Sequence, residues 1–150
     1  MKRLMMILVA AVAMAAAAAA QPRAAGVRIG WGSELSYQHT LGGENFLEAG
    51  VGLGSFTNSF FSATALYNFM LVRPDFTPRG TWGVYAGPGA GVIFTREWAA
   101  GGIVGDLGIE YTFWFPLQLS LDVRPALMVG GEGIVTNSIF NFGLGIRYTF

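Results

Sequence analysis

Apolar and polar residues alternate with a period of two along most of this chain. Over residues 117–129 the odd positions are apolar, from Leu117 to Val129, and the even positions from Gln118 to Arg124 are polar. Successive side chains of a strand point to opposite faces, so this alternation predicts a strand with one apolar face. The same pattern predicts strands at residues 47–53, 61–71, 82–94, 103–113 and 140–150.

Residues 26–41 are ambiguous, because their apolar positions stay in one phase over the whole length. They fit one long strand or two short ones. A three-residue loop at residues 32–34 would pair Trp31 with Leu35 and Ile29 with Tyr37, and it would keep both apolar faces on one side of the sheet. A two-residue loop would place the two apolar faces on opposite sides.

The beginning of the chain has the features of an export signal. Met1, Lys2 and Arg3 precede an apolar run that extends from Leu4 to Ala20. This order is typical of a cleaved secretory signal peptide, which we expect at residues 1–20. A retained membrane helix is the weaker alternative, because the run is barely long enough to span a bilayer and no charged stop follows.

Cleavage would leave about 130 of the 150 residues, enough for one domain at residues 21–150. The sequence contains no cysteine, which excludes disulfides and a lipid-anchored cysteine. Lys2 and Arg3 would leave with the signal, so seven of the nine basic residues remain against nine acids. Because no basic patch remains, we expect no nucleic-acid partner.

Composition decides what the apolar strand faces contact. Hydrophobic residues make up 53% of the sequence and charged residues only 12%, whereas a soluble domain is about one quarter charged. A soluble sandwich or lipocalin-like barrel would place its charges outside, but the polar faces here are mostly glycine, serine, threonine and asparagine. The apolar faces match a lipid-facing band, and only a closed barrel lets strands cross lipid.

The fold class that we predict is therefore all-β, a closed up-and-down antiparallel transmembrane β-barrel. Bacterial single-chain barrels have an even number of strands, so residues 26–41 should divide at residues 32–34 and give eight strands. Aromatic residues should lie in two girdles, where lipid meets water. With both termini periplasmic, one girdle would contain Phe69, Trp82, Phe113, Trp114, Phe115, Tyr148 and Phe150, and the other Trp31, Phe56, Phe60, Phe94, Trp98 and Phe140.

The signal peptide, the hairpin "GIEYTFWFPLQLSLDVRP" and the ending "GLGIRYTF" together resemble a small eight-stranded outer-membrane barrel of the OmpA/OmpX-like kind. This resemblance implies a location in the Gram-negative outer membrane, with outer-membrane lipid and the barrel-assembly machinery as partners. It also implies that Phe150 and Tyr148 form the signal that the assembly machinery recognises. The expected outer loops, at residues 32–34, 56–59, 95–102 and 130–137, are short, which argues against an adhesin or receptor role.

With the polar faces turned inward, seven charged residues would lie in the lumen: Arg28, Glu48, Asp106, Glu110, Asp122, Arg124 and Arg147. The opposite phase would place the two C-terminal arginines in lipid, at roughly 2–4 kcal/mol each near the midplane. Buried charges must be paired, so we expect a salt-bridge network that includes Asp122 with Arg124 and Glu110 with Arg147. This network is either a packed polar core or a gated ion path.

Catalytic chemistry has few candidates. The glycine-rich stretches "YAGPGAG" and "AGVGLGSF" lack the following helix of a phosphate-binding loop, and we expect their glycines to make room for Tyr85, Met70 or arginine side chains. His39 with Ser36 or Ser33 is the only hydrolase-like set, and an interfacial histidine at a strand end is the better interpretation. No metal-ligand spacing occurs, and we expect no cofactor.

We therefore predict a monomeric outer-membrane protein with a structural or envelope-maintenance role and no enzymatic activity. The alternatives are a porin-like passage or small-ligand barrel, then a lipid-modifying enzyme, and then a soluble periplasmic ligand-binding barrel.

Overall fold

The alternating segments all form strands in the computed structural model, which describes residues 22–41, 43–54, 60–131, 133–134 and 140–150. The expected signal peptide lies outside these residues. Within the described ranges, no helix is long and apolar enough to cross a membrane. The strands are β1 (Pro22–Ile29), β2 (Ser33–Thr40), β3 (Phe46–Leu53), β4 (Phe61–Val72), β5 (Thr81–Phe94), β6 (Ala99–Thr112), β7 (Gln118–Arg124), β8 (Ala126–Gly130), β9 (Gly133–Ile134) and β10 (Asn141–Thr149).

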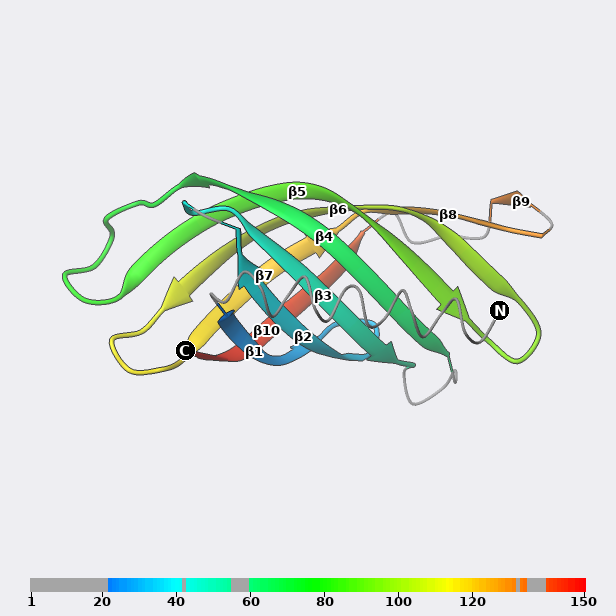
Figure 1. Ribbon diagram of the computed structural model, residues 1–150, viewed down its shortest axis with the longest axis horizontal. Helices are drawn as coiled ribbons and strands as arrows, with labels where there is room; N and C mark the ends of the chain where they lie inside the picture. Colours follow the sequence, from blue (N-terminus) through cyan, green and yellow to red (C-terminus); the bar gives the residue numbers. More distant parts are fainter. Residues whose placement is uncertain (1–21, 42, 55–59, 132, 135–139) are drawn as a thin grey trace.

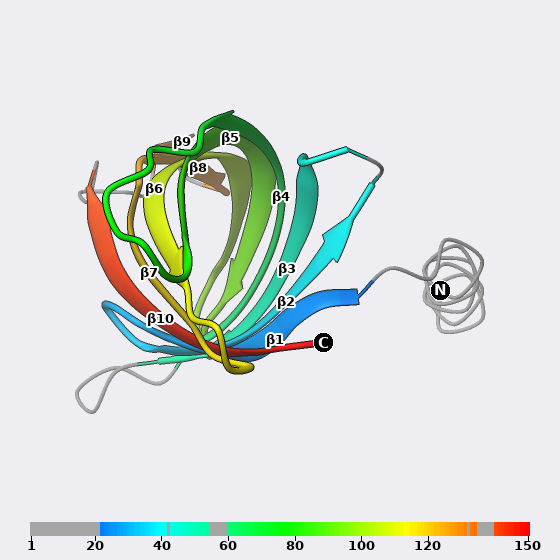
Figure 2. The same ribbon diagram turned by 90° about the vertical axis from the view of Figure 1, so that its left-hand side faces the viewer.

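These strands close into a ring (Figures 1 and 2). The order is β5-β4-β3-β2-β1-β10-β7-β6, every pairing is antiparallel, and β5 also pairs with β6. β7 and β8 occupy one place in the wall, because both pair with β6 in one continuous register on either side of Pro125. Proline has no N–H for the ladder, yet its carbonyl oxygen accepts from Gly105 N at 2.7 Å. The predicted closed barrel of eight antiparallel strands in up-and-down order is confirmed.

The ambiguous segment at residues 26–41 divides between β1 and β2, which gives the even number of strands that we expected. The position of the turn was wrong: residues 30–32 form it, and Ile29 pairs with Ser33 rather than with Tyr37. β1 begins at Pro22, earlier than expected, so both strands are eight residues long. The earlier turn places Glu34 inside β2, where its carboxylate reaches Arg124 at 2.8 Å.

The two faces of the wall differ sharply in chemistry. Along β3 and β10, buried and accessible residues alternate one by one over most of the strand, and the accessible ones are apolar at nearly every position. Large apolar side chains such as Leu35, Leu121 and Phe142 are more than half exposed on the outside. Every charged residue in the described strands is instead buried or half-buried and bonded to interior groups. The prediction that the polar face of each strand turns inward and the apolar face outward therefore holds around the ring.

Aromatic side chains gather at the two ends of the barrel. The end with the start of β1, the end of β10 and residues 73–80 and 113–117 is called the terminal end (Figure 1). There, Trp82 packs on Tyr111 with ring centroids 4.8 Å apart, and the cluster continues through residues 113–115. The opposite end, with residues 30–32 and 95–98, is called the distal end.

At the distal end, Phe61 packs on Phe94, and Trp31, Trp98 and Phe140 are exposed. Phe56 of the predicted girdle and the predicted loop at residues 56–59 lie outside the described residues. Phe60, also predicted for this girdle, is half-buried. The predicted loop at residues 95–102 is shorter than expected, because β6 already begins at Ala99.

Candidate functional site

The interior is built around Arg124, which β7 turns into the barrel. Its two terminal nitrogens donate to Glu34 Oε1 at 2.8 Å and Glu48 Oε1 at 2.6 Å. Its Nε lies 3.6 Å from an Asp106 oxygen and 3.7 Å from an Asp122 oxygen. One guanidinium thus faces four carboxylates from β2, β3, β6 and β7, with only 3% of its side chain exposed. The predicted proximity of Asp122 and Arg124 is present as part of a larger set.

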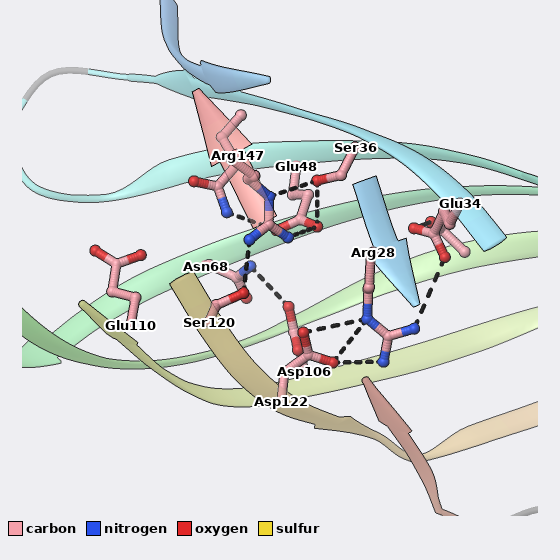
Figure 3. A network of polar contacts seen from close by, with 12 residues as sticks. Arg28, Glu34, Ser36, Glu48, Asn68, Asp106, Glu110, Ser120, Asp122 and Arg147 are labelled. Carbon is pink, nitrogen blue, oxygen red and sulfur yellow. Dashed lines mark hydrogen bonds and ion pairs between the residues drawn. The ribbon is translucent and has the colours of Figure 1, made fainter. Parts of the chain in front are cut away.

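Arg147, from the middle of the last strand, forms the second cationic centre (Figure 3). It donates to Glu48 Oε1 at 2.9 Å, Ser36 Oγ at 2.8 Å and Ser120 Oγ at 2.6 Å. Glu48 also accepts from Ser36 at 2.9 Å and from Gln38 at 2.8 Å. Both charges are fully buried and are surrounded by hydrogen-bond partners, which is the condition under which buried ions are tolerated.

Arg28 forms the third centre and spans the seam where the barrel closes. It leaves β1, crosses β10 and meets Asp122 of β7, with Nε 2.8 Å and 3.1 Å from the two carboxylate oxygens. Figure 3 shows this contact beside Asp106. The guanidinium lies over Gly143 of β10, at a place that a Cβ atom would occupy. A buried ion pair thus ties the first strand, β1, to β7 across the last strand, β10.

Glu110 lies apart from these centres, toward the terminal end (Figure 3). It forms an ion pair with Arg23, whose guanidinium also lies 4.0 Å from the centre of the Phe46 ring. The expected pair of Glu110 with Arg147 is wrong, because Gln118 of β7 stands between them. Its amide donates to Glu110 at 3.3 Å and its oxygen lies 3.5 Å from Arg147 Nη1.

All seven charged residues that the sequence placed in the lumen are buried, at most 3% exposed. Two further members, Arg23 and Glu34, were missed. Glu34 continues the inward phase of Ser36 and Gln38, so extending the alternation by one step would have found it. Arg23 follows no phase, because the register between β1 and β2 shifts between Pro22 and Ala24.

Inward-facing glycines leave the space that these side chains occupy. The Tyr85 ring lies against Gly108, and a Cβ at Gly83 would be 2.9 Å from Met70 Sδ. The Arg28 guanidinium lies over Gly143 in the same way. These glycines lie outside the two glycine-rich stretches, so the expectation for those stretches was wrong: Gly50 faces the Glu34 carboxylate, and Gly52 faces Ser62.

A cavity of about 720 Å³ lies in the distal half of the interior. Glu34 and Arg124 of the charged network form its floor, and Ser62 and Thr64 add hydroxyl groups from β4. Apolar side chains from β5, β6 and β8 form one wall, and Trp31, Arg96, Glu97 and Trp98 stand at its distal rim. The interior therefore combines a filled polar part with a hollow amphiphilic part.

The hydrolase-like set does not assemble. His39 Nδ1 lies 3.1 Å from the Tyr37 hydroxyl, and its side chain is buried near the terminal end of β2. Ser36 instead donates to Glu48 and accepts from Arg147, while Ser33 is exposed at the opposite end of β2. Within the described residues, no group of three or more histidine, cysteine or acidic side chains could hold a metal ion.

No protein-family model, curated protein or solved structure matches this chain. What the barrel can do is therefore inferred from its own residues. Its buried ion pairs can hold strands together and block the interior, and its cavity has the size and lining of a small-molecule site.

Proposed function

We propose that this protein is an integral outer-membrane barrel of the OmpA/OmpX-like kind, with a structural role in the envelope of a Gram-negative cell. The observation that supports this most strongly is the inverted polarity of the wall. Large apolar side chains are exposed around the ring, and the charged residues of the described strands face inward. A protein surrounded by water favours charged residues outside and apolar residues inside, whereas a wall in contact with lipid requires apolar side chains on its outer face.

The aromatic clusters at both ends support the same location, since membrane barrels concentrate aromatic side chains at the two interfaces. An apolar band between two aromatic girdles fits a single bilayer. We expect outer-membrane lipid as the surrounding partner, a monomer as the functional form, and the barrel-assembly machinery as the partner that recognises Tyr148 and Phe150 during biogenesis.

Fractionation tests this location. The mature protein should stay with the outer-membrane fraction after washes with high salt and alkaline carbonate, and detergent should be needed to release it. Unboiled and boiled samples should migrate differently in gels, because a closed barrel resists unfolding by detergent alone. A mature protein that remains soluble without detergent would contradict the proposal.

A structural role is favoured over a channel because the charged network fills the cross-section. Arg124 and Arg147 are each bonded to several partners from different strands and are almost fully buried. An ion path would need these charges to contact water. We expect no conductance steps when the purified barrel is added to a planar bilayer, and reproducible steps would favour the passage function instead.

An enzymatic role has little support from the geometry. Within the described residues, His39 is hydrogen-bonded to the Tyr37 hydroxyl, and neither a serine nor an orienting acid bonds to it as a triad requires. We expect His39→Ala to leave the composition of the surrounding lipids unchanged in a lipid-activity assay. A loss of lipid modification in that variant would identify the protein as an enzyme.

A further inference from the structure

We propose that the distal cavity is a binding site for a small amphiphile with an apolar chain and a cationic amine head. This site goes beyond the structural role and does not depend on it, since the cavity lies inside the barrel. At about 720 Å³, the cavity falls within the range of small-molecule pockets. Its lining separates into an apolar wall and a polar floor, which is the pattern that an amphiphile fits.

The apolar wall holds the chain. Val104 and Met128 are buried members of the one apolar cluster inside the described barrel, and Ile93 and Ala126 pack against it. All four side chains line the cavity. Because the remaining buried interior is dominated by polar and charged groups, this wall is the place where an apolar chain can leave water.

The charge of the floor selects the head group. In the network beneath the cavity, three arginines (Arg28, Arg124 and Arg147) face four carboxylates (Glu34, Glu48, Asp106 and Asp122). With all seven groups ionised, one negative charge remains in excess. An added cation would therefore be attracted to the floor and an added anion repelled.

The hydrogen-bonding groups of the floor favour the same head. Glu34 lines the cavity and its side chain is 13% exposed, whereas the side chains of the other three carboxylates of the network are 0% exposed. Arg124, the cation of the floor, already donates to Glu34 and Glu48. An ammonium group provides only donors, so it can bond the accessible Glu34 carboxylate without competing for an occupied guanidinium.

The cavity opens toward the distal end, where Trp31 and Trp98 stand at its rim. The rim also contains Arg96 and Glu97, whose opposite charges are adjacent in the chain and offset each other. The excess negative charge that a ligand meets therefore belongs to the floor. The amine should enter first, with the apolar chain behind it along the wall.

Titration of the full barrel in lipid nanodiscs at about pH 8.5, where the carboxylates are ionised and hexylammonium is still a cation, tests the site. The probes are hexylammonium, hexanol and hexanoate, and the measurement is calorimetry. We expect hexylammonium to bind at least tenfold more tightly than hexanoate, with hexanol between them. Glu34→Gln should remove the preference for hexylammonium over hexanol. Equal affinities for the ammonium and the carboxylate, or no saturable binding, would overturn the proposal.

A matched pair of variants on β4 tests the location. Ser62 lines the cavity, whereas Ala65 is exposed on the outer face of the same strand. Ser62→Phe should weaken hexylammonium binding at least tenfold, and Ala65→Phe should leave it unchanged. Partition of the probe into lipid is the same for both proteins, so their difference reports the cavity. Equal binding by the two variants would place the probe elsewhere.

A fluorescence measurement keeps the test decisive if Ser62→Phe fails to fold. Trp98 stands at the cavity rim, whereas Trp82 belongs to the aromatic cluster of the terminal end. Because Trp31 also lines the rim, the change in tryptophan fluorescence on adding hexylammonium should disappear in the double variant Trp31→Phe, Trp98→Phe and persist in Trp82→Phe. The reverse result would contradict the distal site. The test does not depend on the proposed membrane location, because a barrel that proved soluble without detergent could be titrated in the same way.

Discussion

Replacing Gly143 by alanine should destabilise the barrel far more than the loss of one strand glycine would suggest. The Arg28 guanidinium lies directly over Gly143, so the new Cβ atom would overlap Cζ, Nε and Nη2 of that side chain. Real Cβ atoms do not approach other heavy atoms so closely. The guanidinium must move, and the hydrogen bonds of 2.8 Å and 3.1 Å that its Nε makes to Asp122 are lost.

The magnitude follows from the burial of that ion pair. The side chain of Arg28 is 2% exposed and that of Asp122 is 0% exposed. Separating two charges at such a site costs about 3–5 kcal/mol in the free energy of unfolding. The folding equilibrium should therefore fall by a factor of roughly one hundred to several thousand.

Urea titrations of folding into lipid vesicles, followed by tryptophan fluorescence, give this free energy. Gly101→Ala is the control, because Gly101 lies on a neighbouring part of the wall where the nearest atom to a Cβ is 3.6 Å away. The control should change stability by less than about 0.5 kcal/mol. Equal effects of Gly143→Ala and Gly101→Ala would refute the steric reasoning.

A double-variant cycle separates the clash from a general intolerance of β10. Arg28→Met removes the guanidinium and leaves Asp122 without its main partner, so it should cost about as much as Gly143→Ala. In the Arg28→Met background, Gly143→Ala should cost little more, because both changes break the same contact. Fully additive effects would show that Gly143 acts through something other than Arg28.

Three further outcomes are expected. Leu144 lies in the middle of the outer face of β10, so Leu144→Arg should lower the free energy of unfolding in vesicles by about 2–4 kcal/mol. Phe140→Arg, at the distal rim, should lower it by only about 0–1 kcal/mol. Equal costs would contradict a lipid-facing band. Glu48→Gln should lower the urea midpoint more than Glu110→Gln, because Glu48 faces two almost fully buried arginines; the opposite order would be inconsistent with the network. Deleting Phe150, whose side chain is 70% exposed, should reduce membrane assembly in cells more than it destabilises the refolded barrel; equal assembly of truncated and intact chains would argue against an assembly signal.

The sequence could predict the strands and their inward faces because both depend on a local rule. Side chains of a strand alternate between its two faces, so a shift by one residue would turn every charged residue of that strand from the interior to the outer face. The first hairpin shows where the rule ends. A turn at residues 30–32 and one at residues 32–34 preserve the same phase, so the alternation cannot distinguish them. In the structure the turn at residues 30–32 brings Glu34 into β2, where its carboxylate reaches Arg124 across the barrel.

The partners within the lumen could not be predicted for a related reason. The alternation along their strands shows that Glu110 and Arg147 both face inward. Their heights along the barrel axis, however, depend on the stagger between neighbouring strands. In the structure, Gln118 occupies the space between the two, and Glu110 turns to Arg23. Arg23 faces inward only because of the register shift beside Ala24, which leaves no trace in the alternation.

The abundance of glycine and the scarcity of charge have one physical cause in this barrel. Eight strands enclose an interior that side chains just fill, so a long charged side chain fits more easily where a neighbouring wall position has no side chain. Arg28 lies over Gly143, Arg147 over Gly145, and the Glu34 carboxylate over Gly50. These three inward charges thus each occupy the space above an inward glycine. A glycine beneath a charged side chain is therefore part of the ion-pair network, and alanine there should act like the loss of the ion pair itself.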